Sequence, residues 1–426
     1  MIRKLLGDRE FRLLYAGQAL TMFGDVALFL VLAIWVKDLT RSNGAAGLVF
    51  LFFIVPSFAS PLLAVLVDRY PRRLVMLAND VVTGVGILTL LLVHGRGDVW
   101  LIYAVAAFYG LSQQIFFAAR SGLLAGWLES EALGDANGLL ESTRMGLRVV
   151  GPPVGALLYG AFGGGATAML DSATFFASAL FLSLLHVPDI TRTEPTDEPF
   201  LQEVLQGARH LFRTPDLRRM VIVFGLALCV VGTLEPAVFA LADQGLHRTP
   251  EFVGLLGMLE GLGSVAGGIL AGRVLRSGKE LTVLGAGSLV AGLGLAPLAL
   301  ARLAPVFAGL FAVGVGIAAL NVGYFTLLQR RTGNELQGRV FAASETILNL
   351  PYAASIGLGA ALITTVGFRA IYLTNAVVLS VCGLYLLLAR PPGGRTMSNV
   401  AREKLLAPEG TVPPEAPSLD GRSPDR

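Results

Sequence analysis

Long apolar runs separated by short polar segments dominate this chain of 426 residues. A helix needs about 20 mostly apolar residues to cross a bilayer, and the runs reach that length about twelve times. We predict membrane-spanning helices at residues 13–36, 46–67, 74–94, 99–119, 138–161, 166–187, 220–242, 251–272, 280–301, 304–328, 340–365 and 367–389. The pattern therefore predicts an all-α membrane protein with twelve transmembrane helices.

The polar stretch 188–219 interrupts this pattern and contains four prolines. It separates two sets of six runs, which predicts an N-terminal six-helix bundle at 1–187 and a C-terminal one at 220–390. Within the stretch, FLQEVLQGARHLFRTPDLRRM (200–220) has apolar residues at helical spacing and predicts an amphipathic helix along the inner membrane surface. Residues 391–426 are rich in Pro, Gly and charge, and we expect a disordered cytoplasmic tail.

The two sets of runs resemble each other at one fixed offset. The offset is 273 − 69 = 204, and it aligns Arg69 with Arg273, Glu141 with Glu345 and Gly155 with Gly359. Such agreement fits a transporter with two pseudo-symmetric six-helix halves, which binds its substrate near the membrane midplane between them.

Basic residues in the short loops set the orientation, because cytoplasmic loops carry an excess of Lys and Arg. With a cytoplasmic N-terminus, the cytoplasmic side holds Arg3, Lys4, Arg9, Arg12, Arg69, Arg72, Arg73, Arg192, Arg209, Arg213, Arg218, Arg219, Arg273, Arg276, Lys279, Arg330, Arg331, Arg339, Arg390 and Arg395. The opposite side holds Lys37, Arg41, Arg96, Arg248, Arg302 and Arg369. We predict an inner (plasma) membrane protein with both termini in the cytoplasm. Scarce lysine beside abundant Ala, Gly and Arg suggests a bacterial source.

Composition excludes several other classes of function. The chain is 54% hydrophobic and 15% charged, against about 25% charged in soluble domains. A net charge of +3 spread along the chain argues against a nucleic-acid partner. The two cysteines and four histidines show neither a disulfide framework nor metal-ligand spacing, and no phosphate-binding Gly-rich loop is present. We expect no metal, no cofactor and no enzymatic activity.

Three acids fall in the middle of predicted spans: Asp25, Glu235 and Glu260. An ionisable group at the bilayer centre costs about 2.5–3.5 kcal/mol and therefore usually faces a cavity or a partner. A carboxyl in such a cavity can take up and release a proton or bind a cationic group. The alternative is a permanently neutral acid that is hydrogen-bonded to a neighbouring helix.

Polar and aromatic residues in the spans are further candidates for lining a substrate cavity. They are Gln18, Phe29, Gln113, Gln114, Phe117, Asn321, Tyr324, Asn349 and Tyr352. Taken one by one, the aromatic residues among them are equally compatible with packing or with contact to lipid. Asp80 and Asp171 lie nearer to span ends, where we expect them to be solvated or paired.

Glu141, Arg144 and Arg148 share one face of the fifth span, because their spacing is i, i+3, i+7. They lie in its cytoplasmic part, as Glu345 does in the eleventh span. We predict an ion-pair network that locks the state open to the outside.

The turn LAVLVDRYPRRLVML (63–77) resembles the loop 2–3 signature of the major facilitator superfamily, Gly-x-x-x-Asp-Arg-x-Gly-Arg-Arg. The matching residues are Asp68, Arg69, Arg72 and Arg73, whereas Ala64 and Pro71 replace the two glycines. The resemblance implies that these residues gate the cytoplasmic side, with Asp68 joining the ion-pair network or accepting hydrogen bonds from the helix start near Arg339.

A second stretch, GLRVVGPPVGALLYG (146–160), is similar to the span-five motif of family members that exchange drug for proton. Gly146, Gly151, Pro152 and Gly155 match it, and Ala156 replaces its last Gly. Small residues let neighbouring helices approach closely, and the proline lets the helix bend. Ordinary helix packing is the alternative explanation.

Residues 11–30 and 123–144 resemble the branch of this family that contains macrolide-efflux and enterobactin-export proteins, and the resemblance covers about residues 1–390. The span-four arginine motif of many proton-coupled members is not visible, and Arg120 lies at that span's cytoplasmic end. The resemblance implies a protein of the lipid bilayer that exports an amphipathic small molecule, such as an antibiotic or another secondary metabolite, in exchange for protons. Because rocking of two halves within one chain needs no partner subunit, we expect a monomer. The alternatives are a siderophore exporter and a non-transporting membrane sensor or scaffold.

Overall fold

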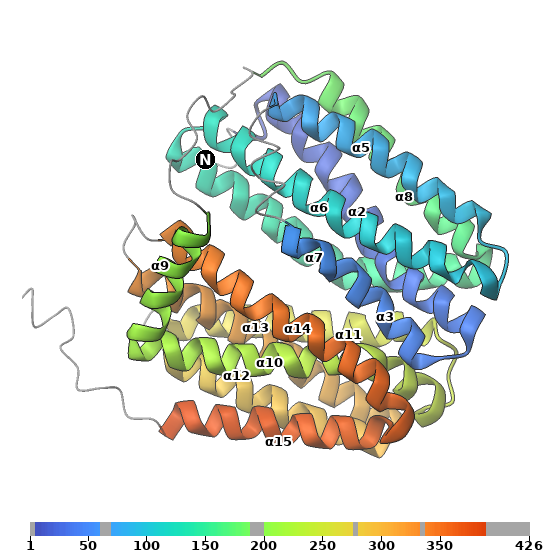
Figure 1. The fold of residues 1–426 in the computed structure, drawn as a ribbon, viewed down its shortest axis with the longest axis vertical. Coiled ribbons are helices and arrows are strands. Elements are labelled where there is room, and N and C mark those ends of the chain that lie inside the picture. The colour runs from blue at the N-terminus through green and yellow to red at the C-terminus, as the bar shows by residue number, and fades with distance from the viewer. Residues whose placement is uncertain (1–4, 60–69, 188–199, 276–279, 333–336, 389–426) are drawn as a thin grey trace, which may run out of the picture. The chain divides into compact units, whose positions relative to one another are not determined.

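Helices form all the regular secondary structure in residues 5–59, 70–187, 200–275, 280–332 and 337–388, the part of the chain that the computed structural model describes (Figure 1). The first set comprises α2 (Arg9–Thr40), α3 (Asn43–Ile54), α5 (Arg72–Leu88), α6 (Val99–Trp127), α7 (Ser130–Phe162) and α8 (Gly164–Ser183). After α9 (Phe200–Arg213), the second set comprises α10 (Pro215–Ala240), α11 (Phe252–Leu275), α12 (Glu280–Leu295), α13 (Leu303–Arg331), α14 (Gln337–Thr365) and α15 (Gly367–Leu388).

Eleven of the described helices are long and apolar enough to cross a membrane. The second predicted span, 46–67, corresponds to the shorter apolar helix Asn43–Phe58, and residues 60–69 lie outside the described part. The all-α transmembrane fold predicted from hydropathy is confirmed. Helix α2 starts at Arg9, before its apolar run, because the Asp8 side chain accepts a hydrogen bond from the backbone N–H of Glu10 and caps the helix.

The two sets follow the internal repeat. Shifting α6 by 204 residues gives 303–331, which are the bounds of α13. The same shift carries α8 onto 368–387, within one residue of each end of α15. Each six-helix set is therefore built in the same order, as expected for two pseudo-symmetric bundles.

Small residues bring helices of one bundle into backbone contact. A Cβ atom on Gly287 of α12 would lie 2.8 Å from the carbonyl oxygen of Gly316 on α13, a distance that real Cβ contacts do not reach. Two turns further along α12, a Cβ atom on Gly294 would lie at the same distance from the carbonyl oxygen of Gly309. Because lipid gives helices no hydrophobic reason to associate, close van der Waals packing of this kind holds the bundle together.

The amphipathic segment is shorter than predicted. Helix α9 ends at Arg213, and Pro215 starts α10, because proline is well tolerated in the first turn of a helix. Leu211 of α9 is buried, and Nε2 of His210 lies 3.2 Å from the carbonyl oxygen of Arg331 at the end of α13. Figure 1 shows α9 against one end of α10 and α14. The bundle and linker boundaries stay predictions, and the predicted tail, 391–426, lies outside the described part.

Candidate functional site

Helix α7 lies between α2 of its own bundle and α11 of the other. On one side, a Cβ atom on Gly151 would lie 2.7 Å from Cγ1 of Val26, and one on Gly155 would collide with the carbonyl oxygen of Ala27. On the other side, a Cβ atom on Gly254 of α11 would lie 2.8 Å from the Cβ of Ala156. The span-five motif is thus packed on both faces at the junction of the bundles.

Gly146 does not share this environment, although it was predicted as part of the motif. A Cβ atom there would meet nothing within 4 Å. The close approach of α2 and α7 begins further along the helix, so Gly146 is not needed for packing.

We expect Gly155→Val to destabilise the fold, because the added atoms would force α2 and α7 apart. Overpacking of this kind costs about 1–3 kcal/mol. Thermal unfolding of the purified protein checks this, with Gly146→Val as the matched control, since open space surrounds that position. Equal stability of the two variants would contradict the packing role of Gly155.

The bundles meet at one end and separate towards the other. Helix α3 packs on α10 and α14, where a Cβ atom on Gly47 would lie 2.6 Å from the Cβ of Pro236. Contact between α7 and α11 continues to Gly261, whose added Cβ would lie 3.1 Å from Cγ2 of Val149. Beyond that point, Gly268 and Gly272 of α11 face open space. The interface is therefore closed at the end where α2 meets α3 and open at the end where α9 lies.

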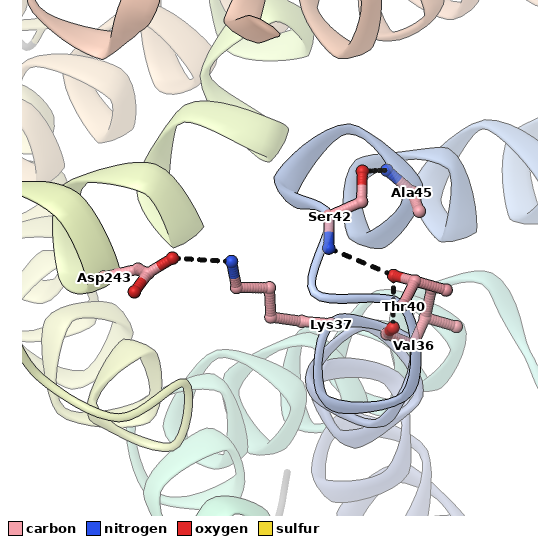
Figure 2. A network of polar contacts seen from close by, with 6 residues as sticks. All are labelled: Val36, Lys37, Thr40, Ser42, Ala45 and Asp243. Atoms are coloured by element: carbon pink, nitrogen blue, oxygen red, sulfur yellow. Dashed lines mark hydrogen bonds and ion pairs between the residues drawn. The ribbon is translucent and has the colours of Figure 1, made fainter. Parts of the chain in front are cut away.

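An ion pair between a buried lysine and a half-exposed aspartate joins the bundles at the closed end (Figure 2). Nζ of Lys37, on α2, lies 2.7 Å from Oδ2 of Asp243, in a π-helical turn that follows α10. The Lys37 side chain is only 6% exposed and that of Asp243 is 50% exposed. Sequence reasoning counted Lys37 as a loop charge and passed over Asp243. The sequence signal that could have identified this ion pair is the lysine at the end of an otherwise apolar run.

The turn beside this ion pair is held by short-range hydrogen bonds. The Thr40 hydroxyl donates to the carbonyl oxygen of Val36 at 2.7 Å and accepts from the N–H of Ser42 at 3.2 Å. The Ser42 hydroxyl in turn caps α3 by accepting from the N–H of Ala45 (Figure 2). These bonds hold the short connection between α2 and α3 next to the ion pair.

Among the described members of the predicted cytoplasmic ion-pair network, Glu141, Arg144 and Glu345 form no ion pair across the bundles. Nη1 of Arg144 lies 3.6 Å from Oε2 of Glu141 within α7, and both side chains are about half exposed. Glu345, on α14, accepts a hydrogen bond at 3.5 Å from Asn349 of the same helix. Because the bundles are separated at this end, Glu141, Arg144 and Glu345 reach only partners within their own helices. Arg148 instead interacts electrostatically with Glu260 of α11.

The structure describes two of the four signature residues of the turn, Arg72 and Arg73. Asp68 and Arg69 lie outside the described part of the chain. Arg72 is buried, with its guanidinium against Gly122 of α6. Arg73 donates through Nε to the Leu182 carbonyl oxygen at 2.8 Å and through Nη2 to that of Ser183. These carbonyls lie at the end of α8, so Arg73 ties α5 to α8 rather than reaching the other bundle.

Asp25, predicted in mid-span, receives hydrogen bonds from two side chains of α6. The Tyr109 hydroxyl donates to Oδ1, and Nε2 of Gln113 donates to Oδ2 at 2.7 Å. The structure thus brings Gln113 to Asp25, whereas nothing of this kind joins the neighbouring Gln114 to the acid. Asp25 is half-buried and lines a cavity of about 40 Å³ together with Asp80 and Arg120.

Asp80 and Asp171 are buried rather than solvated, which corrects the prediction. Their exposed fractions are 0% and 1%, and neither forms an ion pair with any described residue. Asp171 fits against α2 only because Gly24 has no side chain there, and Thr174 donates to its Oδ1 at 3.3 Å. Asp80 is the ninth residue of α5, in the packed part of the helix, and not near its end.

Two acids of the second bundle face the junction. Glu235 and Glu260 are both half-buried and interact electrostatically with each other. The Tyr352 hydroxyl on α14 donates to Oε1 of Glu235 at 3.5 Å. With Arg148 opposite Glu260, carboxyl groups from this bundle and a guanidinium from the other line the interface.

Gln18 lines the same cavity as Asp25, whereas two predicted cavity residues of α13 have partners within the second bundle. Asn321 donates to the Ile317 carbonyl oxygen of its own helix at 2.9 Å. Tyr324 is 1% exposed and stacks on Phe224 with ring centroids 4.1 Å apart. It belongs to the core of the second bundle, so its prediction as a cavity residue is wrong: its helix turns the ring towards α10.

Comparisons with known proteins point in one direction. The profile of the Major Facilitator Superfamily matches residues 14–356. Macrolide efflux protein A of Streptococcus pyogenes is 21% identical over 379 residues, covering 87% of this chain and 93% of that protein. Multidrug resistance protein MdtG of Yersinia enterocolitica is 24% identical over 353 residues, covering 80% and 82%. A bacterial homologue of the iron transporter ferroportin, solved in its inward-facing state, has the same fold, with a TM-score of 0.69, 15% identity and coverage of 89% and 99%.

Proposed function

Because the chain belongs to the major facilitator superfamily, we propose that this transporter exports an amphipathic small molecule from a bacterial cell in exchange for protons. The observation that carries the proposal is the set of carboxyl groups within the membrane-spanning helices: Asp25 in the first bundle, and Glu235 and Glu260 facing the junction from the second. Acids at this depth are costly and are kept where they serve an ion or substrate path.

The second-bundle acids suit a cargo with a cationic group. Glu235 and Glu260 lie together, and Arg148 is the charge that faces Glu260 across the junction. A cationic cargo would compete with Arg148 for this carboxylate and thereby couple its own binding to the spacing of the bundles. The likeness to macrolide-efflux and multidrug-resistance proteins supports an amphipathic cargo of this kind.

Protons can drive such export. Each proton that re-enters down a potential of 100 mV supplies about 2.3 kcal/mol. Asp25 can bind that proton while it stays anchored to α6 through Tyr109 and Gln113.

The open end of the junction is assigned to the cytoplasm. It carries the basic ends of several helices, among them Arg73, Arg213, Arg330 and Arg331, and basic residues accumulate on the cytoplasmic side. Both termini of the protein then face the cytoplasm. In the alternating-access cycle, the structure is the state that receives cargo from inside the cell.

Proton movement in inverted membrane vesicles tests the proposal. Vesicles carrying the protein are energised until their lumen is acidic and are then challenged with macrolides, other cationic drugs and siderophores. We expect proton release from the lumen on addition of a cationic amphipathic compound, and none in vesicles without the protein. Release by siderophores alone would replace the cargo class, and silence across the panel with folded, inserted protein would contradict export of this class.

A further inference from the structure

Helix α9 has two apolar edges, and only one of them packs on the second bundle. Leu211 and Gly207 are buried, whereas Leu205 and Phe212 are 58% and 44% exposed. Leu205 and Phe212 lie two helical turns apart along the chain and therefore share one face. Successive residues point about 100° apart around a helix, which places Leu211 on a different face. An apolar face of α9 is thus left uncovered by the described part of the chain.

Two arginines border this face. Arg209 lies one turn from Leu205, Arg213 lies one turn further, and both are exposed. Neither forms an ion pair with any other described residue. Asp216, at the start of α10, is buried and pairs instead with Arg331 of α13 at 2.9 Å. Like charges one turn apart on a helix repel each other, so an anion between the two guanidinium groups would relieve this repulsion.

Helix α9 lies where the chain enters the membrane. One residue, Thr214, separates its last residue, Arg213, from the membrane-spanning helix that starts at Pro215. It packs against one end of α10 and α14 (Figure 1), and Nε2 of His210 lies beside the carbonyl oxygen of Arg331 at the end of α13. Because these three helices cross the membrane, their ends lie at its surface. The uncovered face and its arginines therefore lie at the level of the lipid headgroups.

The chemistry of this surface fits one kind of occupant. Arginine binds phosphate groups through two parallel hydrogen bonds, and the apolar side chains of an interfacial helix lie against acyl chains. A free phosphate ion would satisfy Arg209 and Arg213 but leave Leu205 and Phe212 in water. A second copy of the chain, bound through the same face, would bring the arginines of both copies together. An anionic phospholipid offers a phosphate and acyl chains without adding positive charge.

We propose that Leu205, Arg209, Phe212 and Arg213 of α9 form a binding site for an anionic phospholipid of the cytoplasmic leaflet. The arginines bind the phosphate of the headgroup, and the two apolar side chains lie along the acyl chains. Basic residues beside a membrane-spanning helix on its cytoplasmic side are attracted to anionic lipid. The site goes beyond the proposed export, and it rests on that proposal only for the leaflet in which the lipid lies.

Lipid binding is measured without cargo, on the purified full-length protein in detergent, by native mass spectrometry. The protein is titrated with phosphatidylglycerol, which is anionic, and with phosphatidylcholine of the same acyl chains, which is zwitterionic. We expect phosphatidylglycerol to bind about tenfold more tightly or better. The double variant Arg209→Gln/Arg213→Gln should weaken phosphatidylglycerol binding by about 25-fold, because one arginine near an anionic membrane surface contributes about fivefold.

Two further double variants make the result specific to α9. Arg302→Gln/Arg369→Gln removes the same charge from exposed positions at the other end of the second bundle, so it should leave phosphatidylglycerol affinity close to native. Leu205→Ser/Phe212→Ser keeps the arginines and removes the acyl-chain contact, so it should weaken binding of both lipids alike. All these positions are exposed, and an unchanged unfolding temperature checks that each variant is folded.

The assay separates the other occupants of this face. Equal affinity for the two lipids, or equal loss in the two arginine double variants, would overturn the site. Displacement of phosphatidylglycerol by inorganic phosphate would show a site for soluble anions instead. A dimer in the mass spectrum that Leu205→Ser/Phe212→Ser abolishes would show that a second copy covers the face. Because neither cargo nor a proton gradient enters the assay, a failed vesicle assay leaves this result standing, and failure here leaves the proposed export intact.

Discussion

Asp25→Asn is expected to lower cargo-driven proton movement by about 10²-fold or more, the lower range of effect for a side chain that transfers a proton. Asparagine is nearly isosteric with aspartate: its Oδ1 can still accept from Tyr109, and its NH₂ group can donate to Gln113 once the Gln113 amide turns its Oε1 towards it. The fold should therefore persist while the proton-binding group is lost. The measurement is proton release in inverted vesicles, with insertion quantified for each variant.

A matched control lies on the same helix. Asp38 also accepts a hydrogen bond from a tyrosine, with Tyr159 Oη 2.9 Å from its Oδ2, but it lies near the end of α2 and not at the cavity. Asp38→Asn should keep cargo-driven proton movement within about threefold of native, because it neutralises a similar tyrosine-bonded carboxyl group without touching the proton path. Native-like proton release in correctly inserted Asp25→Asn would show that Asp25 takes no part in coupling.

Asp25→Glu sharpens the interpretation. It keeps the carboxyl group but adds a methylene beside α6, so partial activity is expected. Proton release by Asp25→Glu but not by Asp25→Asn would show that the exchangeable proton of the carboxyl group is responsible. Loss in both would indicate that the geometry of the Tyr109 and Gln113 contacts is what matters.

The order of the helices could be predicted from hydropathy, because a membrane-spanning helix needs a long apolar run. The repeat offset of 204 then matched helices of the first bundle to their counterparts in the second. Asp25 could be singled out because an acid inside such a run is rare. Helix ends were less predictable. Capping by Asp8 and the continuation of α2 to Thr40 depend on local hydrogen bonds, which hydropathy does not measure.

Side-chain partners could not be read from one sequence. Asp80 was expected near water because the start of its span was placed two residues beyond the observed helix start, and burial came from α8 packing over it. Tyr324 was expected in a cavity, but helix rotation stacks it on Phe224. Arg73 matched a gating signature, yet here it bonds the end of α8. Each difference arises from tertiary packing, which spacing along one helix does not encode.

The second large effect is expected at the closed end of the junction, where Lys37 pairs with Asp243. The pair joins α2 of one bundle to the turn after α10 of the other, and the lysine is almost fully buried (Figure 2). Removing Asp243 leaves the charge of the buried Lys37 ammonium group uncompensated. Under the proposed cycle this end must open to release cargo, so the ion pair stabilises the closed arrangement.

Asp243→Lys should shift the protein towards opening at this end, because two ammonium groups would then face each other across the junction. Half exposure of Asp243 screens part of the effect, which leaves about 1–3 kcal/mol, or five- to 150-fold in the ratio of open to closed forms. The measurement is the distance distribution between spin labels at Arg41 and Thr249, both exposed, after Cys229 and Cys382 are replaced by alanine.

Two further variants decide whether the ion pair itself is responsible. Gln244→Lys adds the same charge to the same turn at an exposed position and leaves the pair intact, so the native distances should persist. The exchange Lys37→Glu with Asp243→Lys restores opposite charges and should recover most of the closed population. Unchanged distances in Asp243→Lys would show that backbone packing of α3 on α10 and α14 alone closes this end. A shift in Asp243→Lys that the exchange reverses would instead identify the ion pair as the contact that release of cargo must break.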